Sequence, residues 1–201
     1  MNIQGQIEIE GIQLINFNCL SIDEIDMVLS WRNNIEIRQW MINSDEIPIQ
    51  EHISFIESLK TSENKVYFLA KRNEKNLGVI YFNDYNNETK QAEFGLYLNP
   101  SYLGSGLGFE LFFCIIQIAF IKLKLDKIYS QSKVENTNTL MLHEFFGIKE
   151  QRIISQRVGG VDMNLSYRLI TKSEFEKMPS NLKEVKKHLR QFLLQNLSQM
   201  E

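Results

Sequence analysis

The stretch from residue 91 to residue 120 constrains the fold of this chain more than any other. Residues 92–98 alternate between apolar and other side chains, and a period of two predicts a β-strand with two different faces. Pro100 ends that strand, because proline has no N–H to continue a ladder of hydrogen bonds. A long apolar run of helical length begins near Gly108. The sequence therefore predicts a central strand, a glycine-rich loop and a buried helix, in that order.

The loop between this strand and this helix has the chemistry of a phosphate site. A helix start presents unpaired backbone N–H groups and the positive end of a macrodipole. Glycines let a pyrophosphate approach the backbone and allow positive φ. The loop has neither the Gly-Lys-Ser/Thr of a nucleotide triphosphate site nor a G-x-G-x-x-G motif, so we expect another cofactor that bears a pyrophosphate, with a plain tight turn as the alternative. Its residues are Leu103, Gly104, Ser105, Gly106, Leu107 and Gly108.

The composition argues against several classes of protein. A net charge of −3 disfavours a nucleic-acid-binding surface. Charged residues interrupt the longest apolar run, residues 107–125, so we expect no membrane span. The three histidines lie far apart, and Cys19 and Cys114 lack the spacing of a metal site, so we expect no metal. So few cysteines fit a reducing compartment, and we expect a cytoplasmic protein.

A second signature follows in residues 127–149, where a β-rich segment leads to Asn136, a short helical stretch and Gly147. With both signatures in this order, the chain resembles the GNAT superfamily of N-acetyltransferases over roughly residues 11–169. The resemblance implies that acetyl-CoA is the co-substrate and that the glycine loop holds its pyrophosphate. It also implies that Asn136 contacts the pantetheine arm, and that the backbone near Leu98 donates to the thioester oxygen.

Three residues bear on the chemistry that the resemblance implies. Leu103 stands where relatives usually carry Arg or Gln, so we expect one polar contact to the phosphates to be missing. His143 stands where relatives carry a tyrosine general acid, and a protonated imidazole would fill that role. Otherwise His143 packs on its helix and the thiolate leaves unassisted, since a thiol pKa is ~8.5. Glu93 is expected to take the proton of the attacking amine, usually through water, with a surface glutamate as the alternative.

The family builds its acceptor site from the first helices, where this chain has a distinctive series of residues. Trp31-Arg32, Trp40-Met41 and His52 are similar to a series in the N-acetyltransferases of pseudaminic acid biosynthesis. Those enzymes acetylate the 4-amino group of a UDP-linked 4-amino-4,6-dideoxy-N-acetyl-altrosamine. Trp40 and Met41 offer an apolar platform for uracil or a deoxysugar methyl group, and Arg32 can face phosphate. The resemblance thus predicts a nucleotide-sugar acceptor bound by Arg32, Trp40, Met41 and His52.

Two other functions stay open at this point. A ribosomal-protein-type N-terminal acetyltransferase also begins with a Trp-rich stretch in its helices. A non-catalytic module that binds acyl-CoA is the other alternative, because Leu103 and His143 both depart from the family pattern. Turnover with a UDP-amino sugar, with a peptide or with neither separates the three.

The predicted fold is α+β: a GNAT-like central, mostly antiparallel twisted sheet flanked by helices. We expect the acetyltransferase domain to span residues 1–172 and a C-terminal helical extension to span residues 173–201. In the extension, Leu182, Val185 and Leu189 recur at helical spacing opposite a face rich in lysine. We expect this helix to pack on its own domain, or to form a contact in a homodimer or with another partner.

Overall fold

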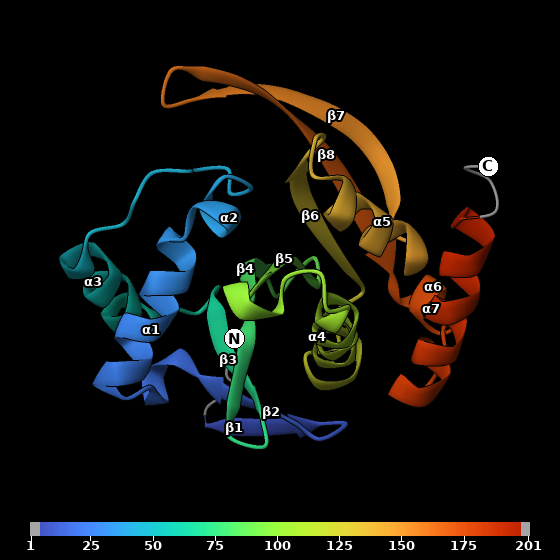
Figure 1. Ribbon diagram of the computed structural model, residues 1–201, viewed down its shortest axis with the longest axis horizontal. Helices are drawn as coiled ribbons and strands as arrows, with labels where there is room; N and C mark the ends of the chain where they lie inside the picture. The colour runs from blue at the N-terminus through green and yellow to red at the C-terminus, as the bar shows by residue number, and fades with distance from the viewer. Residues whose placement is uncertain (1–4, 198–201) are drawn as a thin grey trace.

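The computed structural model describes residues 5–197 and has one large sheet at its centre (Figure 1). Within that range eight strands lie in the order β1-β2-β3-β4-β5-β6-β8-β7, and each neighbouring pair is antiparallel except β5 with β6. This mostly antiparallel sheet with flanking helices confirms the predicted α+β class. The strands are β1 (Gln6–Ile9), β2 (Ile12–Asn16), β3 (Val66–Arg72), β4 (Lys75–Asn86), β5 (Gln91–Leu98), β6 (Lys127–Lys133), β7 (Lys149–Val158) and β8 (Val161–Thr171).

Helices flank the sheet on both sides. In Figure 1, α1 to α3 stand on one side of the central strands, and α4 to α7 stand on the other. A π-helical turn, Ile118–Lys122, follows α4 directly. The α-helices of the described range are α1 (Ile22–Asn33), α2 (Ile35–Arg38), α3 (Ile49–Leu59), α4 (Leu107–Gln117), α5 (Thr137–Phe145), α6 (Lys172–Phe175) and α7 (Leu182–Leu197).

Alternate side chains of the central strands fill two separate cores. Phe68 of β3 and Ile80 of β4 belong to the core that surrounds α4. Their neighbours Leu69 and Val79 belong to the core under α1 and α3. Because successive strand residues point to opposite faces, this alternation is what a sheet covered by helices on both faces requires.

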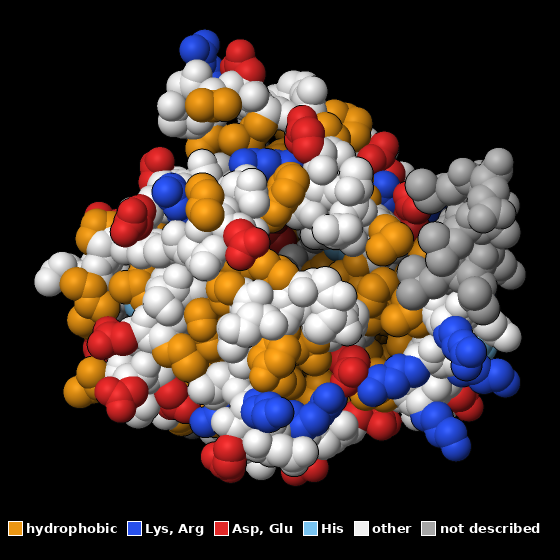
Figure 2. Space-filling model, in the orientation of Figure 1, with side chains coloured by type: hydrophobic (Ala, Val, Ile, Leu, Met, Phe, Trp, Pro, Cys, Tyr) orange, Lys and Arg blue, Asp and Glu red, His pale blue; other side chains and the backbone are white. Residues whose placement is uncertain are grey.

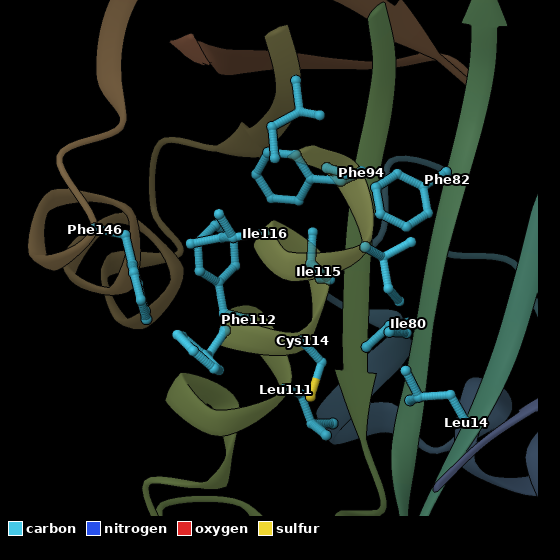
Figure 3. Packing of buried hydrophobic residues seen from close by; sticks show 14 of the residues in the cluster. Leu14, Ile80, Phe82, Phe94, Leu111, Phe112, Cys114, Ile115, Ile116 and Phe146 are labelled. Atoms are coloured by element: carbon cyan, nitrogen blue, oxygen red, sulfur yellow. The ribbon is translucent and has the colours of Figure 1, made fainter. Parts of the chain in front are cut away.

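Helix α4 is buried on nearly every side. Each residue of segment 111–116 is 2% exposed or less. Figure 3 shows Leu111 and Cys114 on the side of Ile80, whereas Phe112 lies on the side of Phe146. Full burial of such side chains contributes about 1.5–3 kcal/mol each. The helix start, and with it the glycine loop, is therefore held rigidly beside the end of β5.

The C-terminal helix α7 packs on this same body. Leu182 and Val185 are buried, and the ring of Phe192 makes an edge contact with Phe145 at 5.4 Å. Lys186 Nζ lies 3.0 Å from Glu110 in the first turn of α4, and Arg72 pairs with the same carboxylate. The expected packing of this helix on its own domain is therefore observed. Figure 2 shows Lys and Arg side chains gathered over α7 on its outer side.

Local sequence signals account for several element boundaries. The Ser21 side chain accepts a hydrogen bond from the Glu24 N–H, and the Glu24 carboxylate accepts one from the Ser21 N–H. A complete capping box therefore begins α1. Asn136 caps α5 through the Thr139 N–H at 3.2 Å. The pair Gly159-Gly160 predicts a hairpin turn, and the turn lies there, between β7 and β8.

Three local predictions need correction. No sequence pattern predicts the short helix α2, which Asn34 caps. The helix expected over residues 107–125 ends in the π-turn, because its last residues follow the bend that leads into β6. The polar run that begins at Asp84 predicts a hairpin connection, but the turn comes later, since β4 continues through an irregularity to Asn86. Helical spacing also predicts Leu193 and Leu197 on the apolar face of α7, and their side chains lie outside the described residues.

Candidate active site

The site is built on the separation of two parallel strands. Pairing of β5 with β6 covers residues 91–93 against 127–129 and then stops. Beyond that point, residues 94–98 of β5 and 130–133 of β6 diverge, and a cavity of about 420 Å³ opens between them. Figure 2 shows the face hollowed near its centre. Strand edges left unpaired in this way offer backbone N–H and C=O groups to an extended ligand.

Both halves of the chain line this cavity. The sheet contributes residues from β3 to β6, helices α1, α3, α4 and α5 contribute others, and the loop after α2 and the turn at Phe17 complete the lining. Among the lining residues Glu93 carries the acidic charge and Arg32 the basic one. The sequence-predicted residues that line the cavity are Arg32, Trp40, Met41, His52, Glu93, Asn136 and His143. Leu98 and the whole glycine loop, residues 103–108, do not line it, and Leu103 is 42% exposed on that loop.

The glycine loop has the backbone geometry expected of an anion site. Gly104 and Gly106 have φ of 74° and 80°, values that favour glycine, and Gly106 is the N-cap of α4 without a side-chain cap. Within the described residues, the N–H groups of Gly104, Gly106 and Gly108 donate to no backbone carbonyl. Ser105 Oγ accepts the Leu107 N–H at 3.3 Å. Three neighbouring N–H groups and the dipole of α4 thus remain available to a phosphate.

Glu93 sits where a proton acceptor is useful. It is half-buried on β5, on the side of the sheet that faces α1 and α3. Burial raises the pKa of its carboxyl, the nearby charge of Asp84 raises it further, and a hydrogen bond from Asn83 partly offsets both. Tyr67 Oη in turn donates to Asn83 Oδ1 at 3.1 Å. A carboxylate with a raised pKa is a stronger base than an ordinary glutamate.

His143 is in the cavity wall, but its environment contradicts the cationic role expected of it. The side chain is 2% exposed between the rings of Phe94 and Phe112, at 5.7 and 6.0 Å. Burial, with a smaller contribution from the charge of Arg168, lowers the pKa of His143 to about 3. The imidazole is therefore neutral near pH 7. A protonated His143 that donates to the leaving thiolate does not fit this environment, and the residue acts here as a neutral, buried wall of the cavity.

Two buried polar groups on the acceptor side of the cavity lack protein partners. Arg32 Nη2 donates to the Asn43 carbonyl at 2.7 Å, but Arg32 Nη1 is buried without a hydrogen bond. No carboxylate of the described chain pairs with this guanidinium. His52 Nε2 is also buried and unpaired, and burial lowers the pKa of His52. Unpaired buried polar atoms are costly, so each is a place where a ligand can supply the missing hydrogen-bond partner.

The apolar platform predicted from the sequence lies at the mouth of the cavity. Trp40 is 39% exposed, and Met41 beside it packs against the core under α1. Their segment is tied to the opposite side of the cavity, because Lys133 Nζ on β6 donates to the Gln39 carbonyl at 2.7 Å. The predicted acceptor residues are thus brought together, although Trp31 is buried in the core.

Several residues of the cavity were missed by sequence reasoning, and three of them are polar groups of interest. Tyr67 and Tyr81 stack with ring centroids 4.8 Å apart, and Ser130 Oγ is buried without a partner. Tyr67 lies on β3 and Tyr81 on β4, and the register of these strands with β5 decides which side chains reach Glu93. No spacing within the sequence shows that register, so no local signal pointed to them.

Comparison with known proteins identifies the family. Residues 16–149 match the family described as "Acetyltransferase (GNAT) domain". The chain belongs to the GNAT acetyltransferases. It is 38% identical to "Acetyltransferase PseH" of Campylobacter jejuni strain NCTC 11168 over 133 residues, which are 66% of this chain and 82% of the relative. The same protein of strain 81-176 is 36% identical over the same shares.

Solved structures agree with this assignment. The crystal structure of C. jejuni N-acetyltransferase PseH in complex with acetyl coenzyme A has a TM-score of 0.62 and 27% identity, covering 80% of this chain and 99% of that one. Spermidine N-acetyltransferase from Vibrio cholerae has a TM-score of 0.75 at 20% identity, covering 83% and 99%, and shows the fold alone. The resemblance to GNAT enzymes predicted from the sequence is confirmed.

Two further features of the described residues bear on this GNAT enzyme. Among the described residues, no group of three or more His, Cys, Asp or Glu side chains is placed to hold a metal ion. No helix in the described range has the length and apolar character needed to cross a bilayer.

Substitution at Gly106 tests the phosphate loop. We expect Gly106→Val to weaken acetyl-CoA binding tenfold or more, because the side chain would stand among the free N–H groups. Gly11→Val is the matched control, since Gly11 has a φ of 75° and, like Gly106, open space at its Cβ position. Both changes should cost a similar stability, about 1–2 kcal/mol. Isothermal titration with acetyl-CoA that shows equal affinity for the two variants would reject the loop as the site.

The low pKa of His143 predicts a pH-dependent loss of stability. In the unfolded chain the imidazole takes up a proton as the pH falls below about 6.5, whereas in the folded protein it stays neutral to about pH 3. Its contribution to the free energy of unfolding is therefore fully present above pH 6.5. Below that, the contribution is lost by up to about 1.4 kcal/mol per pH unit.

Denaturant titrations between about pH 7 and pH 5 measure this effect. Wild type should lose more stability over that interval than His143→Phe. The exposed His188 supplies the control variant His188→Phe. If wild type and His143→Phe lose stability in parallel, the imidazole is protonated in the folded state and its assignment as a neutral wall is wrong.

Proposed function

We propose that this enzyme transfers the acetyl group of acetyl-CoA to the 4-amino group of a UDP-linked 4-amino-4,6-dideoxy sugar, as in pseudaminic acid biosynthesis. The observation that carries the acceptor assignment is the buried, unpaired Arg32 Nη1 beside the unpaired His52 Nε2. An acceptor with a diphosphate supplies the negative charge that this guanidinium lacks. The similarity to "Acetyltransferase PseH" over 82% of that relative supports the same acceptor class.

The donor fits the opposite part of the site. Free N–H groups at Gly104, Gly106 and Gly108 suit a pyrophosphate, and the gap between β5 and β6 suits an extended arm that carries amide groups. Asn136 borders this gap with its oxygen engaged in capping α5, which leaves its amide N–H free for the arm. A reaction that consumes acetyl-CoA fits the expected cytoplasmic location.

The reaction needs only a base and an ordered approach. The neutral amine attacks the thioester carbonyl, a C–N bond forms, and the C–S bond breaks. Glu93 accepts the proton that the amine loses, directly or through one water. The thiolate takes its proton from solvent, since a thiol pKa near ~8.5 makes it a tolerable leaving group without help from His143.

Mass spectrometry of the products tests the function. Purified protein with acetyl-CoA should add one acetyl group to a UDP-4-amino-4,6-dideoxy sugar and none to peptides with free N-termini. Glu93→Gln is the control for enzymatic origin, and its kcat should fall by about 10²-fold or more because the amide cannot accept a proton. The wild-type rate should also decline as pH falls through the raised pKa of Glu93. That part of the acid limb should be absent in the variant, whose remaining decline follows protonation of the amine. Acetylated peptide without acetylated sugar would overturn the proposal.

A second experiment tests the anion site. Arg32→Met keeps an unbranched apolar stem but removes the charge, so the acceptor KM should rise tenfold or more while the acetyl-CoA KM stays nearly unchanged. The effect should disappear with a 4-amino sugar that has no nucleotide. Lys60→Met is the control for loss of a positive charge, because Lys60 is exposed at the C-terminal end of α3. An equal rise in KM for both acceptors would show that Arg32 does not bind the diphosphate.

A further inference from the structure

The side chain of Tyr81 lies across the neighbouring strand β5 at a glycine, which has no side chain to block it. It pairs with Gly95 in the register of β4 with β5. A Cβ placed on Gly95 would lie 2.1 Å from Tyr81 Cζ and 2.2 Å from its Oη. Any larger residue at position 95 would therefore displace the phenol. Because Glu93 and Tyr97 are the next residues on the same face of β5, the hydroxyl of Tyr81 lies between them.

The ring of Tyr81 is held firmly, but its hydroxyl is not. The ring stacks on Tyr67 with an interplanar angle of 9°, and Phe55 closes the stack with an edge contact to Tyr67 at 5.0 Å. Within the described part of the chain, Tyr81 Oη makes no hydrogen bond, whereas Tyr67 Oη is engaged with Asn83. Tyr81 borders the cavity and is partly exposed to it. A fixed, unpaired hydroxyl next to a base is a group available to the substrate.

The charge state of this hydroxyl suits such a contact. The groups that face it are Tyr67, Glu93, Tyr97 and Arg32. Burial raises the pKa of Tyr81, the two tyrosines and Glu93 raise it further, and Arg32 lowers it slightly. The phenol therefore stays neutral across the working range of the enzyme. A neutral phenol both donates and accepts, so it can accept a hydrogen bond from an amine.

We propose that Tyr81 is a catalytic residue that accepts one N–H of the acceptor amine and so orients it beside Glu93. This inference rests on the proposed function. A neutral primary amine has two N–H groups and one lone pair. With one N–H on Tyr81 Oη and the other directed to Glu93, the lone pair is left to face the thioester, the geometry that amide formation needs. Gly95 is the residue that makes room for this arrangement.

The variant Tyr81→Phe tests the inference because it keeps the stacked ring and removes only the oxygen. We expect kcat/KM for the acceptor to fall tenfold or more, mostly through kcat, while the acetyl-CoA KM and the melting temperature stay near wild type. Tyr85→Phe is the matched control, since Tyr85 on the same strand bonds only Asn87 at the surface. Its kinetics should equal those of wild type.

The outcomes separate this inference from the function on which it rests. Wild type that acetylates the nucleotide sugar, with Tyr81→Phe equally active, overturns the role of Tyr81 alone. A parallel loss of melting temperature and activity would make the hydroxyl structural and also overturn it. If wild type acetylates peptides instead, the proposed function fails, and the same comparison of kcat with that amine decides the role of Tyr81.

Discussion

The architecture depends on where two parallel strands stop pairing. Strands β5 and β6 are hydrogen-bonded only over a few residue pairs. The last pair is Glu93 with Tyr129, and the strands then separate. Each half of the sheet remains paired on its other edge, β5 with β4 and β6 with β8, so the opening costs little of the ladder. Helix α4 packs behind β5, and its Phe112 forms part of the cavity wall. The donor and the acceptor can therefore meet across one opening in an otherwise closed sheet.

Buried groups without partners are concentrated around that opening. Arg32, His52, Ser130 and His143 each contribute an unpaired buried atom, and all four border the same cavity. An unsatisfied buried polar atom costs about 1–3 kcal/mol in a folded protein. Such a cost in one place is typical of a site whose ligand completes the hydrogen bonding. His143 is the exception, since its neutral imidazole sits among aromatic rings.

Much of the fold was predictable because local signals agreed with tertiary packing. The alternation in β5, the capping box of α1 and the glycine turn of the last hairpin each act over a few residues. The glycine loop and Asn136 were likewise visible as motifs. The protonation state of His143 was not, because it depends on Phe94 and Phe112 from two other elements. Tyr81 was also hidden, since its position over Gly95 follows from strand register.

The pairing of Glu110 with both Arg72 and Lys186 has an electrostatic consequence for the donor. Glu110 lies in the first turn of α4, the helix whose start we propose as the pyrophosphate site, and a bare carboxylate there would repel incoming phosphates. Burial tends to raise the pKa of Glu110, yet the two cations hold it below its usual range, so the group is a shielded ion pair. Lys186 belongs to α7, beyond the region that matches the family. The C-terminal helix thus acts as a counter-charge, and it keeps the potential in front of α4 favourable to an anionic donor.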